Sequence, residues 1–288
     1  MKSKYPIYII SKGRWKSRQT SRALEKMKID YYIVVEKQEY IKYAKVIDSK
    51  KILILPQKYL DEYDTFWERA DDNKTGPGPA RNYCWEHSIK LGYKRHWVLD
   101  DNLYKFMRLY KNKRYYCRSI GIFKACEDFV DRYENVALAG MNYSNFCHER
   151  SIMPPYILNT RIYSILLIKN DISYRWRGRY NEDTDLSLNV LKDGYCTILF
   201  NAFLVDKTGT QRLSGGNTDE FYKKEGTKPK SQMLVDMHPD VSRLSFRWNR
   251  WHHYVNYKPF KKNKLIKRKN IVIKKGINEY GMVLNKKK

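Results

Sequence analysis

Short apolar runs alternate with amphipathic stretches through the first two thirds of the chain. Residues 5–10, 31–35 and 51–55 are dense in Ile, Val, Leu and Tyr, which is typical of strands buried on both faces. Between the first two runs, apolar residues recur at helical spacing, so we predict a helix over residues 17–28. The chain therefore begins with a strand-helix-strand pattern.

The same alternation continues beyond residue 78. We expect a helix from Pro79 to about residue 91, because proline suits a first helical turn and Gly92 follows as a stop. Further predicted elements are the strands 96–99, 136–139, 162–168 and 195–199 and the helices 119–132 and 183–193. Repeated β-α-β units predict an α/β fold with a mainly parallel sheet flanked by helices.

The pattern divides the chain into three segments. Residues 1–207 contain the alternating strands and helices of the predicted α/β domain. The stretch 208–230 is rich in Gly, Ser, Thr and Lys, so we interpret residues 208–241 as a mobile loop or acceptor-side segment. Residues 242–288 form a basic, aromatic C-terminal extension.

Charge is distributed unevenly along the chain. The 288 residues contain 57 Lys+Arg against 31 Asp+Glu, a formal net charge of +26. From Arg243 to Lys288 there are 15 basic residues and one acid, Glu279, so this segment alone carries +14. Such charge favours a polyanionic partner: nucleic acid, nucleotide phosphates or an anionic membrane surface. The alternative is a codon bias toward lysine in an AT-rich genome.

The composition disfavours several classes of protein. The longest uncharged apolar stretch, residues 162–168, is far shorter than the roughly 18 residues that a membrane span needs. The N-terminal apolar run is too short for a signal peptide. The five cysteines include no CxxC pair, and no Cys/His set has zinc spacing. We therefore expect a reduced, cytoplasmic protein without structural zinc.

Polar residues at the ends of predicted strands are the first candidates for chemistry, since ligands bind beyond the carboxyl ends of parallel strands. Asp100, Asp101 and Asn102 directly follow the strand predicted at 96–99. Adjacent carboxylates repel unless a cation or proton lies between them, and oxygen ligands select Mg²⁺ or Mn²⁺. The alternative is an ordinary turn, because these residues are common turn formers.

Two predicted helix starts add further candidates. Arg81 lies in a Gly-Pro-Gly-Pro-Ala-Arg-Asn stretch, where backbone N–H groups, the helix dipole and the guanidinium all favour phosphate. Asp183, with Glu182 before it, opens a later helix on the same rim as Asp100 and would suit a general base. An ordinary helix N-terminus is the structural alternative in both cases.

The first two strands are also followed by polar residues. The loop Ser11-Lys12-Gly13-Arg14-Trp15 is basic and contains glycine, which suits the phosphates or base of a nucleotide, although it has no GxGxxG or P-loop pattern. Glu36 ends the second strand, where it would accept hydrogen bonds from a ribose or base. Plain exposure at a strand end explains Glu36 equally well.

The order of these strands, helices and polar residues along the chain resembles the GT-A fold of family-2-like glycosyltransferases over about residues 5–206. The shared features are a basic loop after the first strand, an acid after the second, Ala-Arg-Asn before a strand that ends in Asp-Asp, and Glu-Asp opening a later helix. A closer resemblance, to the phage TET-associated glycosyltransferases, rests on residues 5–15, 78–82, 97–102, 181–186 and 248–254. That group is associated with decorating hydroxymethylated pyrimidines in phage DNA.

The resemblance implies roles for the residues of the donor side. Ser11 and Arg14 would hold the nucleotide, and Glu36 would contact its base or ribose. Arg81 would approach the diphosphate. The expected donor is a UDP-sugar, with UDP-glucose as the commonest case.

The resemblance also implies a metal ion. Asp100, Asp101 and Asn102 would match the DxD element and bind Mn²⁺ or Mg²⁺ bridging the diphosphate, with Asp100 also lying against the donor nucleotide. Many enzymes of this fold add a histidine ligand after the catalytic helix, but residues 199–216 contain none. Asp206 would substitute for that histidine.

On the acceptor side, Asp183 would deprotonate the attacking hydroxyl with support from Glu182, and a single displacement would invert the sugar's configuration. The implied acceptor is DNA. Lys and Arg that bind its phosphates displace condensed counterions, and a base flipped out of the duplex would stack on aromatic rings. The candidate contacts are Arg212, Arg247, Trp248, Arg250, Trp251, His252, His253 and Tyr254. The alternative for this stretch is a final amphipathic helix that packs on the sheet.

Three other functions stay open. A non-catalytic nucleic-acid-binding protein would need only the basic extension. A metal-dependent nuclease would also use paired acids, but the usual acid-then-ExK pattern is not evident, since Glu36 is followed by Lys37-Gln38. A glycosyltransferase of the same fold acting on a glycan or protein would keep the chemistry and change the acceptor.

The resemblance further implies a phage-encoded protein of the host-cell cytoplasm.

Overall fold

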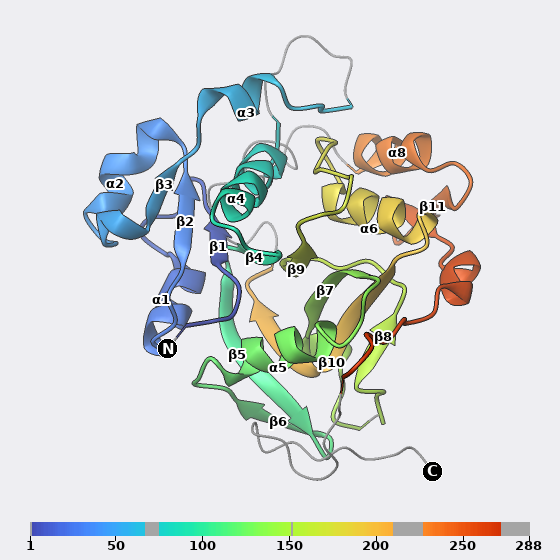
Figure 1. The fold of residues 1–288 in the computed structure, drawn as a ribbon. Helices are drawn as coiled ribbons and strands as arrows, with labels where there is room; N and C mark the ends of the chain where they lie inside the picture. The colour runs from blue at the N-terminus through green and yellow to red at the C-terminus, as the bar shows by residue number, and fades with distance from the viewer. Residues whose placement is uncertain (1, 67–74, 151, 210–226, 272–288) are drawn as a thin grey trace.

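A mixed β-sheet crosses the molecule, and helices pack on both of its faces (Figure 1). The computed structural model describes residues 2–66, 75–150, 152–209 and 227–271. Within these residues the sheet has ten strands in the order β3-β2-β1-β4-β9-β7-β10-β5-β6, and β8 pairs with β10. The strands are β1 (Ile7–Ile10), β2 (Tyr32–Val35), β3 (Ile52–Ile54), β4 (Arg95–Asp100), β5 (Leu103–Tyr110), β6 (Lys113–Tyr116), β7 (Val136–Tyr143), β8 (Tyr156–Leu158), β9 (Ile165–Lys169) and β10 (Cys196–Lys207).

Most of these strands run in the same direction. β1 pairs in parallel with β2 and β4, and β2 pairs in parallel with β3. β9 is antiparallel to both β4 and β7, so β7 runs in the direction of β4, and β10 pairs with β7 in parallel. β5 and β8 are antiparallel to β10, and β6 extends β5 as a hairpin. The predicted α/β class, with a mainly parallel sheet flanked by helices, is confirmed.

Helices on opposite faces of the sheet build two separate apolar cores. One core includes residues of α1 (Gln19–Lys26), α2 (Tyr40–Ala44) and α5 (Gly121–Val130). The other includes residues of α3 (Gln57–Asp61), α4 (Gly78–Lys90) and α6 (Glu182–Lys192). The connections contain the 3₁₀ helices η1 (Lys37–Glu39), η2 (Ser49–Lys51), η3 (Ser144–Phe146) and η5 (Lys258–Lys262). No helix in the described residues is long and apolar enough to cross a membrane.

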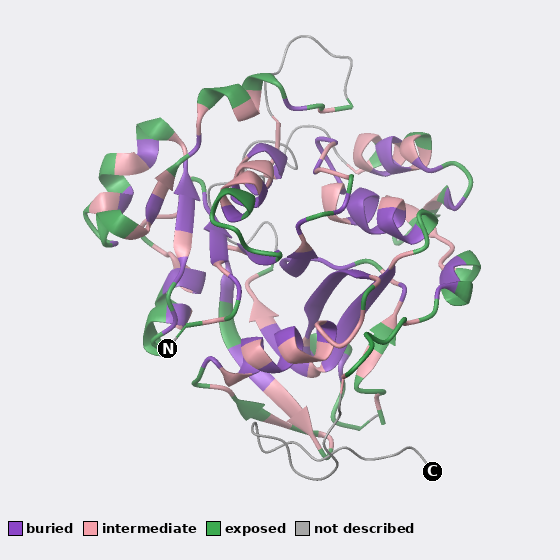
Figure 2. Ribbon diagram, viewed as in Figure 1, coloured by how far each residue is buried: buried purple, intermediate pink, exposed green. Residues whose placement is uncertain are grey.

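Strand β1 shows why the apolar runs predicted the strands. Ile7 and Ile9 point into the first core, whereas Tyr8 and Ile10 point into the second. All four are buried, and Figure 2 shows the central strands as buried between the helix layers. Because both faces of the sheet are covered, the strand has no polar side to alternate with.

The sheet differs from the sequence prediction in several strands, since β5, β6 and β8 have no predicted counterpart. β5 was not predicted, because Lys105 and Arg108 interrupt its apolar residues, as is common in antiparallel strands with one solvated face. β10 continues to Lys207 instead of ending at residue 199. Asn201, which reads as a turn residue, is buried there and accepts a hydrogen bond from Asn142 Nδ2 at 2.8 Å.

A helix precedes the C-terminal extension, and the extension itself begins with a hairpin. α8 (Lys228–Met237) falls within the stretch interpreted as a loop, and residues 210–226 of that stretch lie outside the described residues. β11 (Ser242–Arg247) and β12 (Arg250–Val255) then form an antiparallel hairpin. The amphipathic helix considered for this region is therefore wrong for residues 242–255, whose periodicity is that of strands.

A third apolar cluster anchors α8 and the C-terminal extension to α6. Leu188 and Leu191 of α6 pack with Leu234 of α8 and with Phe260. Asn263 Nδ2 donates to the Leu191 carbonyl at 2.7 Å and so satisfies the C-terminal end of α6. The hairpin is therefore held against the helix that carries the predicted general base.

Candidate active site

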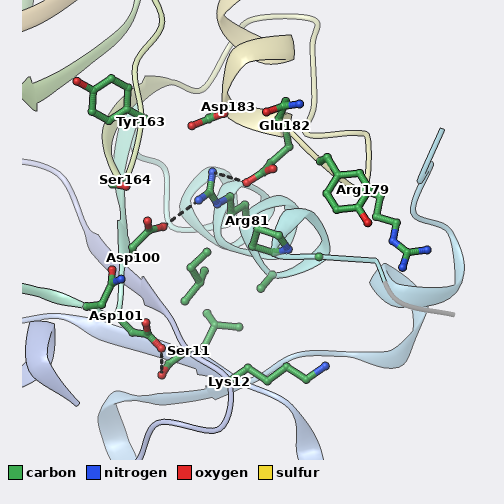
Figure 3. Close-up of a pocket in the computed structure, with 18 of the residues that line it drawn as sticks. Ser11, Lys12, Arg81, Asp100, Asp101, Tyr163, Ser164, Arg179, Glu182 and Asp183 are labelled. Atoms are coloured by element: carbon green, nitrogen blue, oxygen red, sulfur yellow. Dashed lines mark hydrogen bonds and ion pairs between the residues drawn. The ribbon is translucent and has the colours of Figure 1, made fainter. Parts of the chain in front are cut away.

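A cavity of about 410 Å³ opens at the carboxyl ends of β1 and β4, beside the N-terminal ends of α4 and α6 (Figure 3). This is where an open α/β sheet binds its ligands. The predicted site residues that line the cavity are Ser11, Arg14, Glu36, Arg81, Asp100, Asp101, Asn102, Glu182, Asp183 and His253. Segments far apart in the sequence therefore converge at one site.

The basic loop after β1 is held from two sides. Ser11 Oγ donates to Asp101 Oδ2 at 2.7 Å, and Arg14 forms an ion pair with the other oxygen of the same carboxylate. The backbone N–H of Gly13 donates to both carboxylate oxygens of Glu39, at 2.8 and 3.0 Å. These bonds fix the loop at the rim of the cavity.

Glu36, the residue after β2, lies on the same rim. Its Oε1 is 2.8 Å from Lys12 Nζ, and its Oε2 accepts a hydrogen bond from Gln38. Glu36 and Lys12 both line the cavity, so a nucleotide that contacts Glu36 would meet a lysine beside it.

The pKa values of the neighbouring carboxylates Asp100 and Asp101 are shifted in opposite directions. Burial raises the pKa of Asp101, and Arg14 only partly offsets this effect. Burial also acts on Asp100, but Lys207 and Arg81 outweigh it and hold the pKa of Asp100 at about 2. Asp100 Oδ1 is 3.0 Å from Arg81 Nη2, and Asp100 Oδ2 is 2.7 Å from Lys207 Nζ. Asp100 is therefore a fixed anion between two cations.

Asp206 and Lys207, at the end of β10, lie on opposite faces of the strand, as successive strand residues do. The pairing register with β5 shifts between them, since Asp206 is opposite Lys105 and Lys207 is opposite Leu103, which leaves Tyr104 of β5 as the extra residue. Asp206 accepts a hydrogen bond from Ser144, whereas Lys207 lines the cavity. The end of β10 therefore directs the Lys207 amine toward Asp100.

The predicted metal ligands do not fit a divalent cation in this arrangement. Both oxygens of Asp100 bond to cations, and both oxygens of Asp101 bond to the β1 loop. Asn102 donates to the Thr208 carbonyl at 3.1 Å, which leaves its amide oxygen without a hydrogen bond among the described residues. The same residues contain no group of three His, Cys, Asp or Glu side chains that could hold a metal ion. Metal binding stays a prediction.

Arg81 joins the strand edge to α6. It is buried, and its guanidinium carbon lies 4.5 Å from the centre of the Trp176 ring. Besides Asp100, it lies near Glu182, with 3.4 Å between Arg81 Nη1 and Glu182 Oε1. Burial alone would lower the pKa of Arg81, but Glu182 and Asp100 outweigh it and raise that pKa, so the cation is fixed in place.

Two adjacent acids open α6 and point in different directions (Figure 3). Glu182 turns toward Arg81; burial, opposed by Arg81 and reinforced by Asp183, raises the pKa of Glu182 to about 7. Asp183 turns toward the side of Tyr163, and its Oδ1 accepts a hydrogen bond from the Thr184 N–H at 2.7 Å. Its Oδ2 forms no hydrogen bond within the described residues, so it can accept one from a ligand in the cavity.

Asp185, further into the first turn of α6, has a different function. Its side chain is fully buried, 2.8 Å from His238 Nε2, and it accepts two hydrogen bonds from Arg177 at 3.2 Å. A buried carboxylate is stable only with such partners. Asp185 therefore fastens the helix that positions Glu182 and Asp183.

His253 of β12 brings the hairpin to the cavity. Burial and the nearby cations Arg161 and Lys230 lower the pKa of His253 to about 4, so its ring is neutral at pH 7. His253, Arg161 and Lys230 all line the cavity, as does Asp183. This side of the site offers hydrogen-bonding groups close to the carboxylate.

Alternation along the hairpin places the predicted acceptor residues on two faces. One face carries the cross-strand pairs Arg243–Tyr254, Ser245–His252 and Arg247–Arg250, and the other carries Leu244–His253 and Phe246–Trp251. The three arginines of the first face form no ion pair with a carboxylate within the described residues. Trp248, at the tip, has a φ of 49° and is 83% exposed.

The family model described as TET-Associated Glycosyltransferase matches residues 5–216 of the chain. The chain belongs to this family. The match contains the cavity-lining residues from Ser11 to Lys207 and confirms the resemblance drawn from the sequence. The protein is accordingly a glycosyltransferase by family.

Solved structures resemble this TET-associated glycosyltransferase only weakly. The mannose-1-phosphate geranyltransferase of Thermus thermophilus is 12% identical with a TM-score of 0.30; the match covers 70% of this chain and spans 57% of that one. The mannose-6-phosphate isomerase of Helicobacter pylori is 11% identical with a TM-score of 0.28, over 92% and 94% of the two chains. Neither TM-score is high enough to carry an argument. No curated protein matches the chain.

Several predicted residues of this family member lie outside the cavity lining. They are Asp206, Arg247, Trp248, Arg250, Trp251, His252 and Tyr254. Arg212 falls outside the described residues. The role of the hairpin residues as acceptor contacts stays a prediction.

The sequence analysis missed cationic residues that the fold brings to the cavity, namely Arg161, Arg179, Lys207 and Lys230. For Lys207 a signal existed: had the strand predicted at 195–199 been extended, Lys207 would have stood at a carboxyl end, where ligands bind. Arg161 and Arg179 come from irregular segments with no pattern that points to the site.

Proposed function

We propose that this protein transfers a sugar from a nucleoside-diphosphate donor, with UDP-glucose the first to test, to the hydroxymethyl group of a modified pyrimidine in DNA. The observation that carries the proposal is the cavity itself. It holds a carboxylate with an available oxygen, Asp183, beside a buried guanidinium, Arg81, which is the pairing that glycosyl transfer requires.

The donor would lie along the edge formed by the strand ends. Ser11 and Arg14 are fixed at the rim by Asp101, where they would hold the nucleotide, and Glu36 with Lys12 would contact its base or ribose. Arg81 would meet the diphosphate at the start of α4, where backbone N–H groups also favour phosphate.

In the reaction, the acceptor oxygen attacks the anomeric carbon of the sugar while the bond from that carbon to the phosphate oxygen breaks. Asp183 takes the proton of the acceptor hydroxyl, and the electron pair of the broken bond leaves with the nucleoside diphosphate. Glu182 supports this arrangement through Arg81, which it keeps in place at 3.4 Å. A single displacement of this kind inverts the configuration of the sugar.

Two features favour DNA as the acceptor. The exposed face of the hairpin carries Arg243, Arg247 and Arg250 with no carboxylate partner among the described residues, which suits a phosphate backbone. The same hairpin delivers His253 to the cavity beside Asp183. A base flipped out of the duplex would therefore reach the carboxylate while the hairpin contacts the strands.

The test is a transfer assay read by mass. The protein is incubated with a panel of nucleotide sugars and with DNA containing cytosine or hydroxymethylcytosine, and the DNA is then digested to nucleosides and weighed. We expect a hexose mass on the modified base alone, and much slower formation of this product with Asp183→Asn. Absence of any hexose on modified bases, or transfer to a glycan or protein instead, would overturn the DNA acceptor.

A further inference from the structure

We propose that Lys207 and Arg81 together stabilise the departing diphosphate, so that sugar transfer by this protein needs no divalent metal ion. The proposal rests on the proposed function above, and it replaces the metal ion that the sequence predicted. It assigns Lys207 as a further catalytic residue and Asp100 as the residue that positions both cations.

The first observation is the position of Lys207. Its Nζ lies 2.7 Å from Asp100 Oδ2 and 2.8 Å from Ser164 Oγ, at the edge of the cavity. Lys207 and Arg81 thus donate hydrogen bonds to the two oxygens of the Asp100 carboxylate, and both line the cavity. A ligand phosphate that enters beside Asp100 meets two donors whose positions are already set.

The second observation is that the oxygens a metal would need are used within the protein. Asp100 bonds to both cations, Asp101 bonds to Ser11 and Arg14, and Asp206 accepts a hydrogen bond from Ser144. A divalent ion at Asp100 would have to displace an ammonium group that already neutralises the carboxylate. Hard divalent cations need several free oxygen ligands, which these residues do not offer.

The third observation is that Lys207 is held in place within the fold. Its side chain is only 18% exposed, and its ammonium group is fixed by the Asp100 carboxylate and the Ser164 hydroxyl. Fixed cations stabilise developing charge without having to reorganise.

The step balances without a metal. The bond between the anomeric carbon and the β-phosphate oxygen breaks, and its electron pair stays on that oxygen. Lys207 and Arg81 donate hydrogen bonds to the phosphate oxygens as this charge develops, and both remain protonated. The bond between acceptor oxygen and sugar forms at the same time, and the acceptor proton passes to Asp183. The products are the glycosylated acceptor and the nucleoside diphosphate.

The first experiment measures sugar transfer with excess EDTA and with added Mn²⁺. We expect wild-type rates in the two conditions to agree within about twofold, and Lys207→Met to lower kcat by about 100-fold in both, as loss of one transition-state donor does. Lys207→Arg should retain much more activity than Lys207→Met. Lys105→Met is the matched control, because Lys105 lies outside the cavity lining on the neighbouring strand.

The second experiment measures UDP binding by calorimetry in EDTA, which does not depend on turnover. The wild-type protein should bind UDP, and Lys207→Met should bind it about tenfold more weakly because a charge-assisted contact is lost. Circular dichroism of each variant separates this effect from a failure to fold.

The outcomes distinguish this proposal from the proposed function. Activity that EDTA abolishes and Mn²⁺ restores would overturn the metal-free step and leave the glycosyltransferase function intact. Absence of transfer under every condition would overturn the proposed function, while UDP binding would still report on Lys207. Equal UDP affinity of wild type and a folded Lys207→Met variant would overturn the role of Lys207.

Discussion

The cations of the cavity and those of the hairpin have different surroundings. Arg81 and Lys207 are largely covered, and both bond to Asp100. Arg247 and Arg250 are exposed and, within the described residues, have no carboxylate partner. The covered cations are fixed by their partners and can stabilise charge that develops in a reaction. The exposed cations act at longer range, and their attraction for a polyanion is screened by salt.

The positive charge of this chain therefore belongs to two groups of residues, the covered cations of the cavity and the exposed cations of the hairpin. The charges of the cavity should affect the rate of the chemical step, whereas the charges of the hairpin should affect the affinity for DNA and its salt dependence. Variants in the two regions should therefore change different parameters.

The largest expected effect is in the cavity. Asp183→Asn should lower kcat by about 1,000-fold, because an amide cannot take the acceptor proton. DNA affinity should stay unchanged, since Asp183 lies inside the cavity and not on the hairpin face. Initial rates and a DNA-binding titration measure the two quantities. The matched control is Asp193→Asn, at the exposed end of the same helix; retention of activity by Asp183→Asn would remove Asp183 as the base.

The next effect should appear on the hairpin. Arg247→Ala with Arg250→Ala should weaken DNA binding by about 10- to 100-fold at low salt and reduce the slope of log K against log salt by about two. The kcat at saturating DNA should stay within about twofold of wild type. Arg22→Ala with Lys26→Ala, two exposed cations of α1, is the control. An equal loss of affinity in that control would show that the hairpin has no special role.

Trp248 should separate stability from binding. Trp248→Gly should raise Tm by a few degrees, because a φ of 49° costs a tryptophan on the order of 1 kcal/mol that glycine avoids. The same change should weaken DNA binding by about tenfold through lost stacking. Trp248→Phe should keep most of the affinity and the backbone strain. A fall in Tm, or unchanged DNA affinity, would contradict this interpretation of the hairpin tip.

The smallest effect concerns the pH dependence of stability. The pKa of Glu182 rises from 4.5 to about 7 on folding, so the folded chain binds more protons than the unfolded chain between these values. The contribution of Glu182 to stability is therefore full below pH 4.5 and is lost as the pH rises through 7, with a slope of at most about 1.4 kcal/mol per pH unit.

Glu182→Gln should remove this slope, because glutamine does not titrate. Urea denaturation of both proteins across this pH range measures the difference between the two curves. Parallel curves would assign any decline of stability in the wild type to other groups.

Much of the fold could be predicted from the sequence because its strands are covered on both faces. The apolar runs at Ile7–Ile10 and Ile165–Lys169 have no polar alternation, and the residues after β1, β2 and β4 are polar because these strands end at the rim of a cavity. The same rule that placed the candidates at strand ends also placed most of them in one site.

Other elements could not be predicted from local patterns. β5 combines apolar and basic residues, and β10 contains a buried asparagine whose partner, Asn142, lies on another strand. The sequence from Arg247 to Tyr254 does not indicate which of its side chains face the cavity. The hairpin determines this, because successive residues of a strand point to opposite faces, with His253 on one face and Arg250 on the other.

The alternation of the main strands and helices in the α/β domain, the family and the polar residues at the strand ends could be inferred from the sequence, because these depend on local burial and neighbouring residues. Which charges meet depends on the tertiary structure. Asp100 bonds to Arg81, 19 residues away, and to Lys207, 107 residues away. Those contacts depend on the order of the strands in the sheet, and they place Asp100 between two cations that are distant in the sequence.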